Sequence, residues 1–271
     1  MAQDGREMGI DVTASRWGAM TATAAAIWLA KREFDPAARV RVFCLPYAGG
    51  GAAIYRPWAA EVDPALEICP VQLPGRERRL RERPFTAMEP LVAALAEALV
   101  PVLDRPFAFF GYSLGAWVGF ELARYLRATG GPQPVQLFVA GSRAPHLPFA
   151  APPIHDLPRE EFMAALRRLG GTPEEVLRDP ELMALFEPVL RADFAVADGY
   201  VYRQEEPLAC PISAFGGMAD ALASPTSIAA WSTLSRGRFL QRIVPGGHFF
   251  IREERTAVLS AMHVDLGRWL M

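Results

Sequence analysis

From residue 39 to the end of the chain, short apolar runs alternate with longer amphipathic ones. The apolar runs have the length of buried strands, and the amphipathic runs repeat their apolar residues at helical intervals. Such alternation is typical of a mainly parallel sheet with helices packed on it. We therefore predict an α/β fold. The expected strands are residues 38–46, 65–74, 106–111, 135–145, 210–217 and 238–247, and the expected helices are residues 52–62, 88–103, 114–131, 224–231 and 255–271.

One long block interrupts the alternation. Residues 152–202 have a helical pattern punctuated by proline and contain no strand-like run. Open α/β sheets bind ligands at the carboxyl ends of their strands, and a helical insertion between two strands would cover that edge. We expect this insertion to be a lid.

The size and charge of the chain limit its organisation and its partners. With 271 residues, 51% of them hydrophobic, it can bury a large core. We expect one domain at residues 25–271, preceded by an N-terminal extension, residues 1–24, that is disordered or a short helix. The Ala-rich run in the extension is too short to span a bilayer. A formal net charge of −2 gives no global reason to bind nucleic acid or a membrane, so we expect a small or locally recognised partner. We also expect a monomer.

The three cysteines indicate a cellular compartment. Cys44, Cys69 and Cys210 all lie in strand-like apolar runs. An odd number without regular spacing argues against a disulfide framework and favours buried thiols in a reducing compartment. We expect the protein to be cytoplasmic.

A Gly-Tyr-Ser-Leu-Gly pentapeptide occupies residues 111–115, directly between an expected strand and an expected helix. A nucleophilic serine on such a sharp turn needs small residues on both sides, so that strand and helix can approach each other. The pentapeptide therefore indicates Ser113 as a nucleophile. The alternative is that Ser113 is only the N-cap of the helix.

A nucleophilic serine in this context needs an acid and then a histidine, each on a loop after a later strand. Asp220 follows the expected strand at residues 210–217, and His248 follows the one at residues 238–247. An ordinary N-cap would need no such partners. We therefore expect a triad of Ser113, Asp220 and His248.

Other acids and histidines fit structural roles better. His146 and His155 flank the start of the insertion, and His263 lies on the closing helix, where we expect a surface or core side chain. Asp193 and Asp198 lie within the insertion, and we expect them to be solvated or to stabilise their helix.

Acyl transfer also needs N–H donors for the developing oxyanion, each worth about 3–4 kcal/mol. We expect one to be the backbone N–H of Leu114, directly after the nucleophile. The other is expected in the Gly-rich loop at residues 45–53, where we choose Ala48. A phosphate site is the alternative for this loop, but the dinucleotide fingerprint and the P-loop lysine are both missing.

Two further patterns have two interpretations each. An arginine-rich run either docks an acidic partner protein or belongs to a solvated loop, and we favour the loop. The apolar residues of the insertion either line an acyl tunnel or pack as an ordinary core, and we expect some of each. The arginines are Arg76, Arg78, Arg79, Arg81 and Arg83, and the apolar residues are Phe162, Met163, Leu166, Leu169, Met183, Leu185 and Phe186.

Six motifs together carry a family resemblance. They are FCLPYAGGGA, VQLPGRERRL, FGYSLGAWVGFELAR, LRADF, the Gly-x-x-Asp at residues 217–220 and PGGHFFI. From about residue 28 onward, the chain resembles the type II thioesterases that accompany modular polyketide and nonribosomal peptide synthases.

The resemblance implies an α/β-hydrolase fold with a helical lid. It further implies hydrolysis of acyl thioesters on the phosphopantetheine of acyl or peptidyl carrier proteins, with removal of aberrant or stalled acyl groups. The family's triad falls on Ser113, Asp220 and His248, and its oxyanion donors on Ala48 and Leu114. The implied chemistry requires no metal or other cofactor.

Two alternative functions stay open at this stage. One is a generalist esterase, or an acyltransferase of the same fold with another acceptor. The other is a non-catalytic module that binds acyl chains or docks a carrier protein.

Overall fold

The structure is a computed structural model that describes residues 22–31, 33–148 and 152–271. The expected N-terminal extension lies almost wholly outside these ranges. Within them, no helix is long and apolar enough to cross a membrane.

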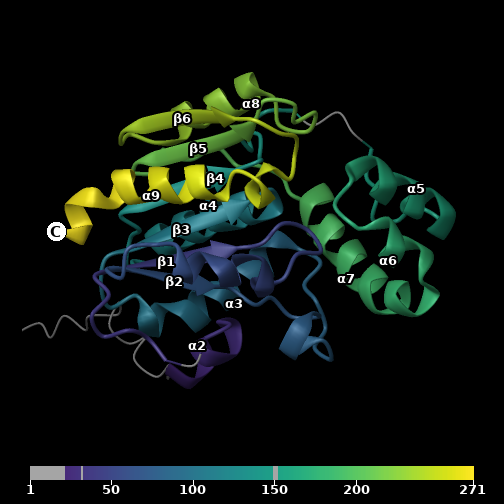
Figure 1. Ribbon diagram of the computed structural model, residues 1–271, viewed down its shortest axis with the longest axis horizontal. Coiled ribbons are helices and arrows are strands. Elements are labelled where there is room, and N and C mark those ends of the chain that lie inside the picture. Colours follow the sequence, from purple (N-terminus) through teal and green to yellow (C-terminus); the bar gives the residue numbers. More distant parts are fainter. Residues whose placement is uncertain (1–21, 32, 149–151) are drawn as a thin grey trace, which may run out of the picture.

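Six parallel strands form one sheet in the order β2-β1-β3-β4-β5-β6 (Figure 1). Five of them lie within the expected strands and β3 extends one residue beyond its expected range, to Tyr112, so the predicted α/β fold with a parallel sheet is confirmed. The strands are β1 (Val40–Leu45), β2 (Leu66–Pro70), β3 (Phe107–Tyr112), β4 (Gln136–Ala140), β5 (Ile212–Gly217) and β6 (Phe239–Val244).

The strands are apolar throughout because helices cover both faces of the sheet. In β1, Phe43 and Leu45 face one core cluster, while Val42 and Cys44 face the other. The first cluster also contains residues of α2 (Ala22–Trp28), α3 (Met88–Leu99), α4 (Leu114–Ala128), α8 (Pro225–Ala229) and the 3₁₀ helix η4 (Ala230–Leu234). The second contains residues of η1 (Ala52–Ala60), η5 (Phe250–Arg252) and α9 (Arg255–Leu270).

Proline alters two of the expected helices. The segment expected at residues 52–62 is the 3₁₀ helix η1, which contains Pro57. The helix expected at residues 88–103 is α3 followed by the 3₁₀ helix η3 (Val100–Val102), which contains Pro101. Because proline has no N–H to donate, it interrupts regular α-helical hydrogen bonding.

The helical insertion, residues 152–202, lies between β4 and β5. It contains α5 (Arg159–Leu169), α6 (Glu174–Arg178) and α7 (Pro180–Asp198), and its described residues include no strand. These helices lie together to one side of the sheet (Figure 1). Their own small core consists of Phe162, Leu166, Leu177, Met183 and Leu190.

The loops after four strands meet at one edge of the sheet, because parallel strands all end there. Ala48 follows β1, Ser113 follows β3, Asp220 follows β5 and His248 follows β6. The loop after β2 leads through the 3₁₀ helix η2 (Glu77–Arg79) to α3. This arrangement brings residues that are distant in sequence to one site.

Candidate active site

Ser113 stands at the sharp turn between β3 and α4. Its backbone angles are φ 53° and ψ −116°, a conformation that is unfavourable for a residue with a Cβ atom. Its N–H donates to the carbonyl of Ala140 at 2.8 Å, which fixes the turn to the neighbouring strand. The Ser113 side chain makes no capping hydrogen bond to α4, so the N-cap alternative does not describe it.

The glycines on either side of the turn allow this geometry. A Cβ atom at Gly111 would lie 2.2 Å from the carbonyl oxygen of Gly115, and one at Gly115 would lie 2.3 Å from that of Leu45. Both contacts are with backbone, which cannot move aside. The close approach of strand and helix therefore requires glycine at both positions.

A chain of hydrogen bonds joins the three expected triad residues. Ser113 Oγ lies 3.1 Å from His248 Nε2, and His248 Nδ1 lies 2.9 Å from Asp220 Oδ2. The phenol of Tyr112 donates to the backbone carbonyl of His248 and holds that loop against β3.

The carboxylate of Asp220 is fully buried. Its second oxygen, Oδ1, accepts the N–H groups of Leu222 at 2.8 Å and Ala223 at 3.1 Å. Both oxygens therefore have donors, as a buried carboxylate requires. This arrangement fixes the rotamer that faces the imidazole.

The two expected oxyanion donors flank Ser113. Leu114 is the first residue of α4, where helix N–H groups have no partner within the helix. Ala48 lies in a turn in which Gly50 N–H donates to Tyr47 O at 2.8 Å. Within the described residues, neither the Leu114 N–H nor the Ala48 N–H donates to a protein acceptor.

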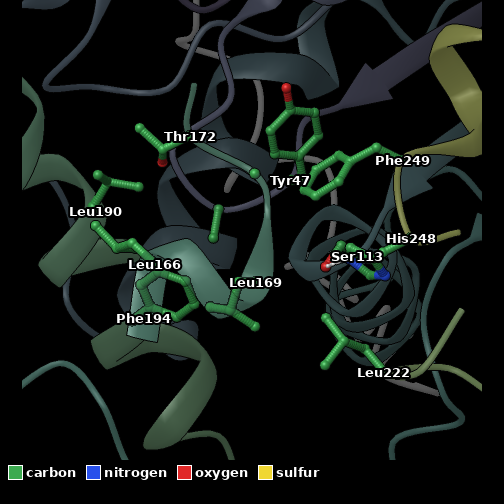
Figure 2. Close-up of a pocket in the computed structure, with 12 residues that line it drawn as sticks. Tyr47, Ser113, Leu166, Leu169, Thr172, Leu190, Phe194, Leu222, His248 and Phe249 are labelled. Carbon is green, nitrogen blue, oxygen red and sulfur yellow. Dashed lines mark hydrogen bonds between the residues drawn. The ribbon is translucent and has the colours of Figure 1, made fainter. Parts of the chain in front are cut away.

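Two cavities open at Ser113 and His248. The smaller has a volume of about 70 Å³, and Figure 2 shows Leu166, Leu190 and Phe194 of the insertion across it from the serine. The larger has a volume of about 570 Å³ and extends between the insertion and the start of α4. Its lining includes Ala48, Leu114, Trp117, Ala165, Leu169, Phe194, Ala197 and Leu222.

Comparison with known proteins identifies the family. The family model described as a thioesterase domain matches residues 40–266. The chain belongs to the thioesterase family. It is 43% identical to the gramicidin S biosynthesis protein GrsT of Aneurinibacillus migulanus over 235 residues, which are 87% of this chain and 92% of GrsT.

Two solved structures resemble this thioesterase over most of its length. One is the thioesterase RedJ from the prodiginine biosynthetic pathway of Streptomyces coelicolor, with a TM-score of 0.78 and 38% identity over 88% of this chain and 92% of RedJ. The other is the type II thioesterase BorB from the borrelidin biosynthetic cluster, with a TM-score of 0.80 and 36% identity over 90% of this chain and 98% of BorB. The α/β-hydrolase fold and the resemblance to type II thioesterases are thereby confirmed, and the activity of the family is thioester hydrolysis.

Of the two roles expected for the acids of the insertion, solvated or helix-stabilising, the structure contradicts the first. The Asp193 side chain is 6% exposed and pairs with Arg76, and that of Asp198 is 8% exposed and lies 2.8 Å from His155 Nδ1. Asp198 also accepts the N–H groups of Ile154 and His155. Neither carboxylate is hydrogen bonded to His248, and both connect α7 to neighbouring segments of this thioesterase.

The arginine-rich run is also only partly a solvated loop. Arg76 and Arg79 are buried. Arg79 Nη1 donates to the carbonyl of Gln72 at 3.0 Å, and the Arg79 guanidinium lies 4.1 Å from the centre of the Trp28 ring. The exposed members are Arg78, Arg81 and Arg83. The expectation failed because Arg76 and Arg79 also have partners that are distant in sequence, Asp193 and Trp28.

The apolar residues of the insertion are divided between its core, the cavity linings and the surface, and the last of these places was not expected. Leu166 and Leu169 line the cavities, Phe162 and Met183 are buried in the insertion's core, and Leu185 and Phe186 are exposed. Sequence reasoning missed Ala165, Phe194 and Ala197. Phe194 and Ala197 could have been found from their helical spacing, which places them with Asp198 on one face of α7.

The remaining histidines and the cysteines stand apart from the triad. His263 is exposed, and burial lowers the pKa of the His146 imidazole. Burial raises the pKa of the Cys44 thiol well above its usual value and that of Cys210 to about 12. These two thiols stay protonated at neutral pH, so they are poor nucleophiles. Among the described residues, no cluster of three acids, histidines or cysteines could hold a metal ion.

Proposed function

We propose that this thioesterase uses Ser113, His248 and Asp220 to hydrolyse acyl thioesters tethered to the phosphopantetheine of carrier proteins. The observation that carries the proposal is the continuous hydrogen-bonded chain from Ser113 Oγ to Asp220, at the mouth of a cavity of about 570 Å³. A cavity of this size and apolar lining suits an acyl group.

The first step is acylation of the serine. As Ser113 Oγ attacks the thioester carbonyl, His248 Nε2 takes the hydroxyl proton and Asp220 stabilises the imidazolium. The N–H groups of Ala48 and Leu114 receive the oxyanion of the tetrahedral intermediate. When the intermediate collapses, the carbon–sulfur bond breaks and the pantetheine thiol leaves. A thiol with a pKa of about 8.5 leaves readily, so protonation of the leaving group matters less than in amide hydrolysis.

The second step is hydrolysis of the acyl-enzyme. His248, neutral again after it has passed its proton to the departing thiol, takes a proton from water, and the hydroxide attacks the acyl-serine carbonyl. The same two N–H groups receive the second oxyanion. The acid is released as His248 returns a proton to Ser113. The chemistry needs no metal or other cofactor.

The proposed substrate is an acyl or peptidyl carrier protein with an aberrant or stalled acyl group. GrsT and BorB support this role, since their names place them in gramicidin S biosynthesis and in the borrelidin biosynthetic cluster. We place the enzyme in the cytoplasm as a monomer. We also assign residues 25–271 to the hydrolase domain and residues 152–202 to its lid.

The nucleophile is tested by labelling with a serine-directed fluorophosphonate. We expect the wild-type protein to be labelled and the Ser113→Ala variant to lose both the label and its turnover, because no other described serine contacts His248. Ser260→Ala, an exposed position on α9, is the matched control and should label normally. Unchanged labelling of Ser113→Ala would mean that another residue is the nucleophile.

The substrate is tested by comparing an acyl carrier protein, acyl-coenzyme A and a p-nitrophenyl ester that bear the same acyl chain. We expect the carrier-bound chain to have the highest kcat/KM. If the kcat/KM for the p-nitrophenyl ester equalled or exceeded that for the carrier-bound chain, this would contradict the editing role and favour a generalist esterase. Fluorophosphonate labelling without turnover of any substrate in water would favour an acyltransferase that needs another acceptor, and no labelling would favour a non-catalytic binding module.

A further inference from the structure

We propose that Asp193 is a positioning residue for the oxyanion hole, because it holds from α7 the Gly-rich turn that carries Ala48. The inference rests on the proposed function, which assigns the Ala48 N–H to the oxyanion. It gives the insertion a role in forming the hole as well as in covering the site.

A four-residue turn such as residues 47–50 can in general adopt either of two common forms. Gly50 N–H donates to Tyr47 O at 2.8 Å, and Gly49 has φ 77°, the combination found in a type II turn with Ala48 and Gly49 at its centre. A type I turn differs by a flip of the peptide between these two central residues. The group that binds the Gly49 N–H therefore selects the form of the turn.

Asp193 is that group. Gly49 N–H donates to Asp193 Oδ2 at 2.7 Å. A flipped peptide would instead turn the carbonyl of Ala48 toward the carboxylate, which is repulsive. The acceptor on α7 thus favours the observed form and anchors the peptide that directly follows Ala48, which limits how far the Ala48 backbone can shift.

Arg76 completes the arrangement. Its Nη1 and Nη2 atoms donate to Asp193 Oδ2 and Oδ1, both at 2.7 Å, and Nη1 also donates to the carbonyl of Gly50 at 2.9 Å. Both side chains are 6% exposed. The pair therefore holds the turn through the N–H of Gly49 and the carbonyl of Gly50.

Packing ties the turn to the same helix. A Cβ atom at Gly49 would lie 2.4 Å from Leu190 Cδ2, so α7 rests directly on the turn. Ala48, the neighbouring residue, lines both cavities together with Ser113. A shift of α7 would therefore move the backbone beside the nucleophile.

The experiment compares Asp193→Ala with Asp193→Asn. Asparagine keeps an oxygen for the Gly49 N–H but loses the ion pair. We expect Asp193→Ala to lower kcat for the carrier-bound thioester about 100-fold, the scale of losing one oxyanion donor, with KM little changed. Asp193→Asn should recover part of that loss.

An acyl trifluoromethyl ketone separates positioning from folding. Ser113 Oγ adds to its carbonyl carbon, the hydroxyl proton passes to His248, and the ketone oxygen becomes an oxyanion. The affinity of Asp193→Ala for this ketone should fall by the same factor as its kcat, whereas its affinity for the carboxylic acid product should not change. A merely structural role would weaken both ligands alike.

Glu187→Gln is the matched control. Glu187 also lies on α7, where it pairs with Arg159 at 2.7 Å and Arg191 at 2.9 Å, both within the insertion. This variant makes the same chemical change in the same helix without contacting the Gly-rich turn. It should bind the ketone as tightly as the wild-type protein.

The double variant Arg76→Met, Asp193→Leu covers the case in which single variants fail to fold. Replacing both members of a buried ion pair with apolar residues is often neutral for stability, but Gly49 N–H still lacks its acceptor. We expect this variant, shown to be folded by circular dichroism, to keep the weakened ketone affinity. Wild-type affinity and kcat in it would overturn the positioning role. If the wild-type protein itself were not labelled by fluorophosphonate at Ser113, the proposed function would fail instead.

Discussion

At the scale of single residues, the proposed nucleophile Ser113 has a strained backbone conformation. A residue with a Cβ atom in such a conformation costs about 1–3 kcal/mol, whereas glycine adopts it freely. Ser113→Ala keeps the strain and Ser113→Gly removes it, although glycine also makes the unfolded chain more flexible. We expect the free energy of unfolding of Ser113→Gly to exceed that of Ser113→Ala by about 1 kcal/mol in urea titrations, with both variants inactive.

The same pair of substitutions at Ser260 provides the control. Ser260 lies within α9, where glycine is about 1 kcal/mol less favourable than alanine. The order of stability should therefore reverse at this position. If glycine were the less stable substitution at both serines, the turn at Ser113 would not be strained.

At the scale of elements, α7 forms one wall of the larger cavity. Phe194, Ala197 and Asp198 lie at helical spacing and line it together. Ala197→Phe would place a bulky ring in the space that a long acyl chain needs. We expect the ratio of kcat/KM for octanoyl and acetyl thioesters to fall at least about tenfold.

Ala195→Phe is the control for this change. Ala195 lies on the same helix and is also half-buried, but it is outside both cavity linings. Its substitution should leave the ratio unchanged. Equal effects at both positions would indicate a general disturbance of α7, and the cavity would then not be the acyl site.

At the scale of the whole molecule, α2 extends the core beyond the residues that match the family, which begin at residue 40. Trp28 and Leu29 are buried, and the Trp28 ring packs against Phe85 and Arg79. A chain that starts at residue 22 keeps α2 and is the reference for its contribution. One that starts at residue 35 should lose about 3–6 kcal/mol, the contribution of two large buried side chains.

Trp28→Ala in the full-length chain tests the same contact without truncation. It should account for a large part of that loss, about 3–5 kcal/mol, because the ring leaves a cavity between α2, Phe85 and Arg79. Denaturant unfolding of all three proteins provides the measurement. If the chain that starts at residue 35 kept the full free energy of unfolding, the domain would begin after α2.

Local sequence patterns predict most of the secondary structure of this protein and the sharp turn at Ser113. Strand and helix positions follow from the period of apolar residues, which depends on near neighbours, and the exceptions occur at Pro57 and Pro101. The pentapeptide at residues 111–115 predicts the sharp turn, because the backbone atoms that exclude a Cβ at its two glycines lie within a few residues or on the adjacent strand. Asp220 and His248 could be named in advance because parallel strands deliver their loops to one edge. Their catalytic roles stay predictions.

Which charged side chains are buried, and which groups they bind, depends on contacts between segments that are far apart in the sequence. Arg76 and Asp193 are 117 residues apart, and no pattern near either one indicates the other. Their pairing depends on how α7 docks on the Gly-rich turn, which is set by packing across the whole domain. The same docking determines the cavity, since its wall combines α4, α7 and the loops after β1 and β6. The order of elements and the residues expected to react therefore follow from local sequence patterns, whereas long-range packing sets how the oxyanion turn is held and what space lies beside it.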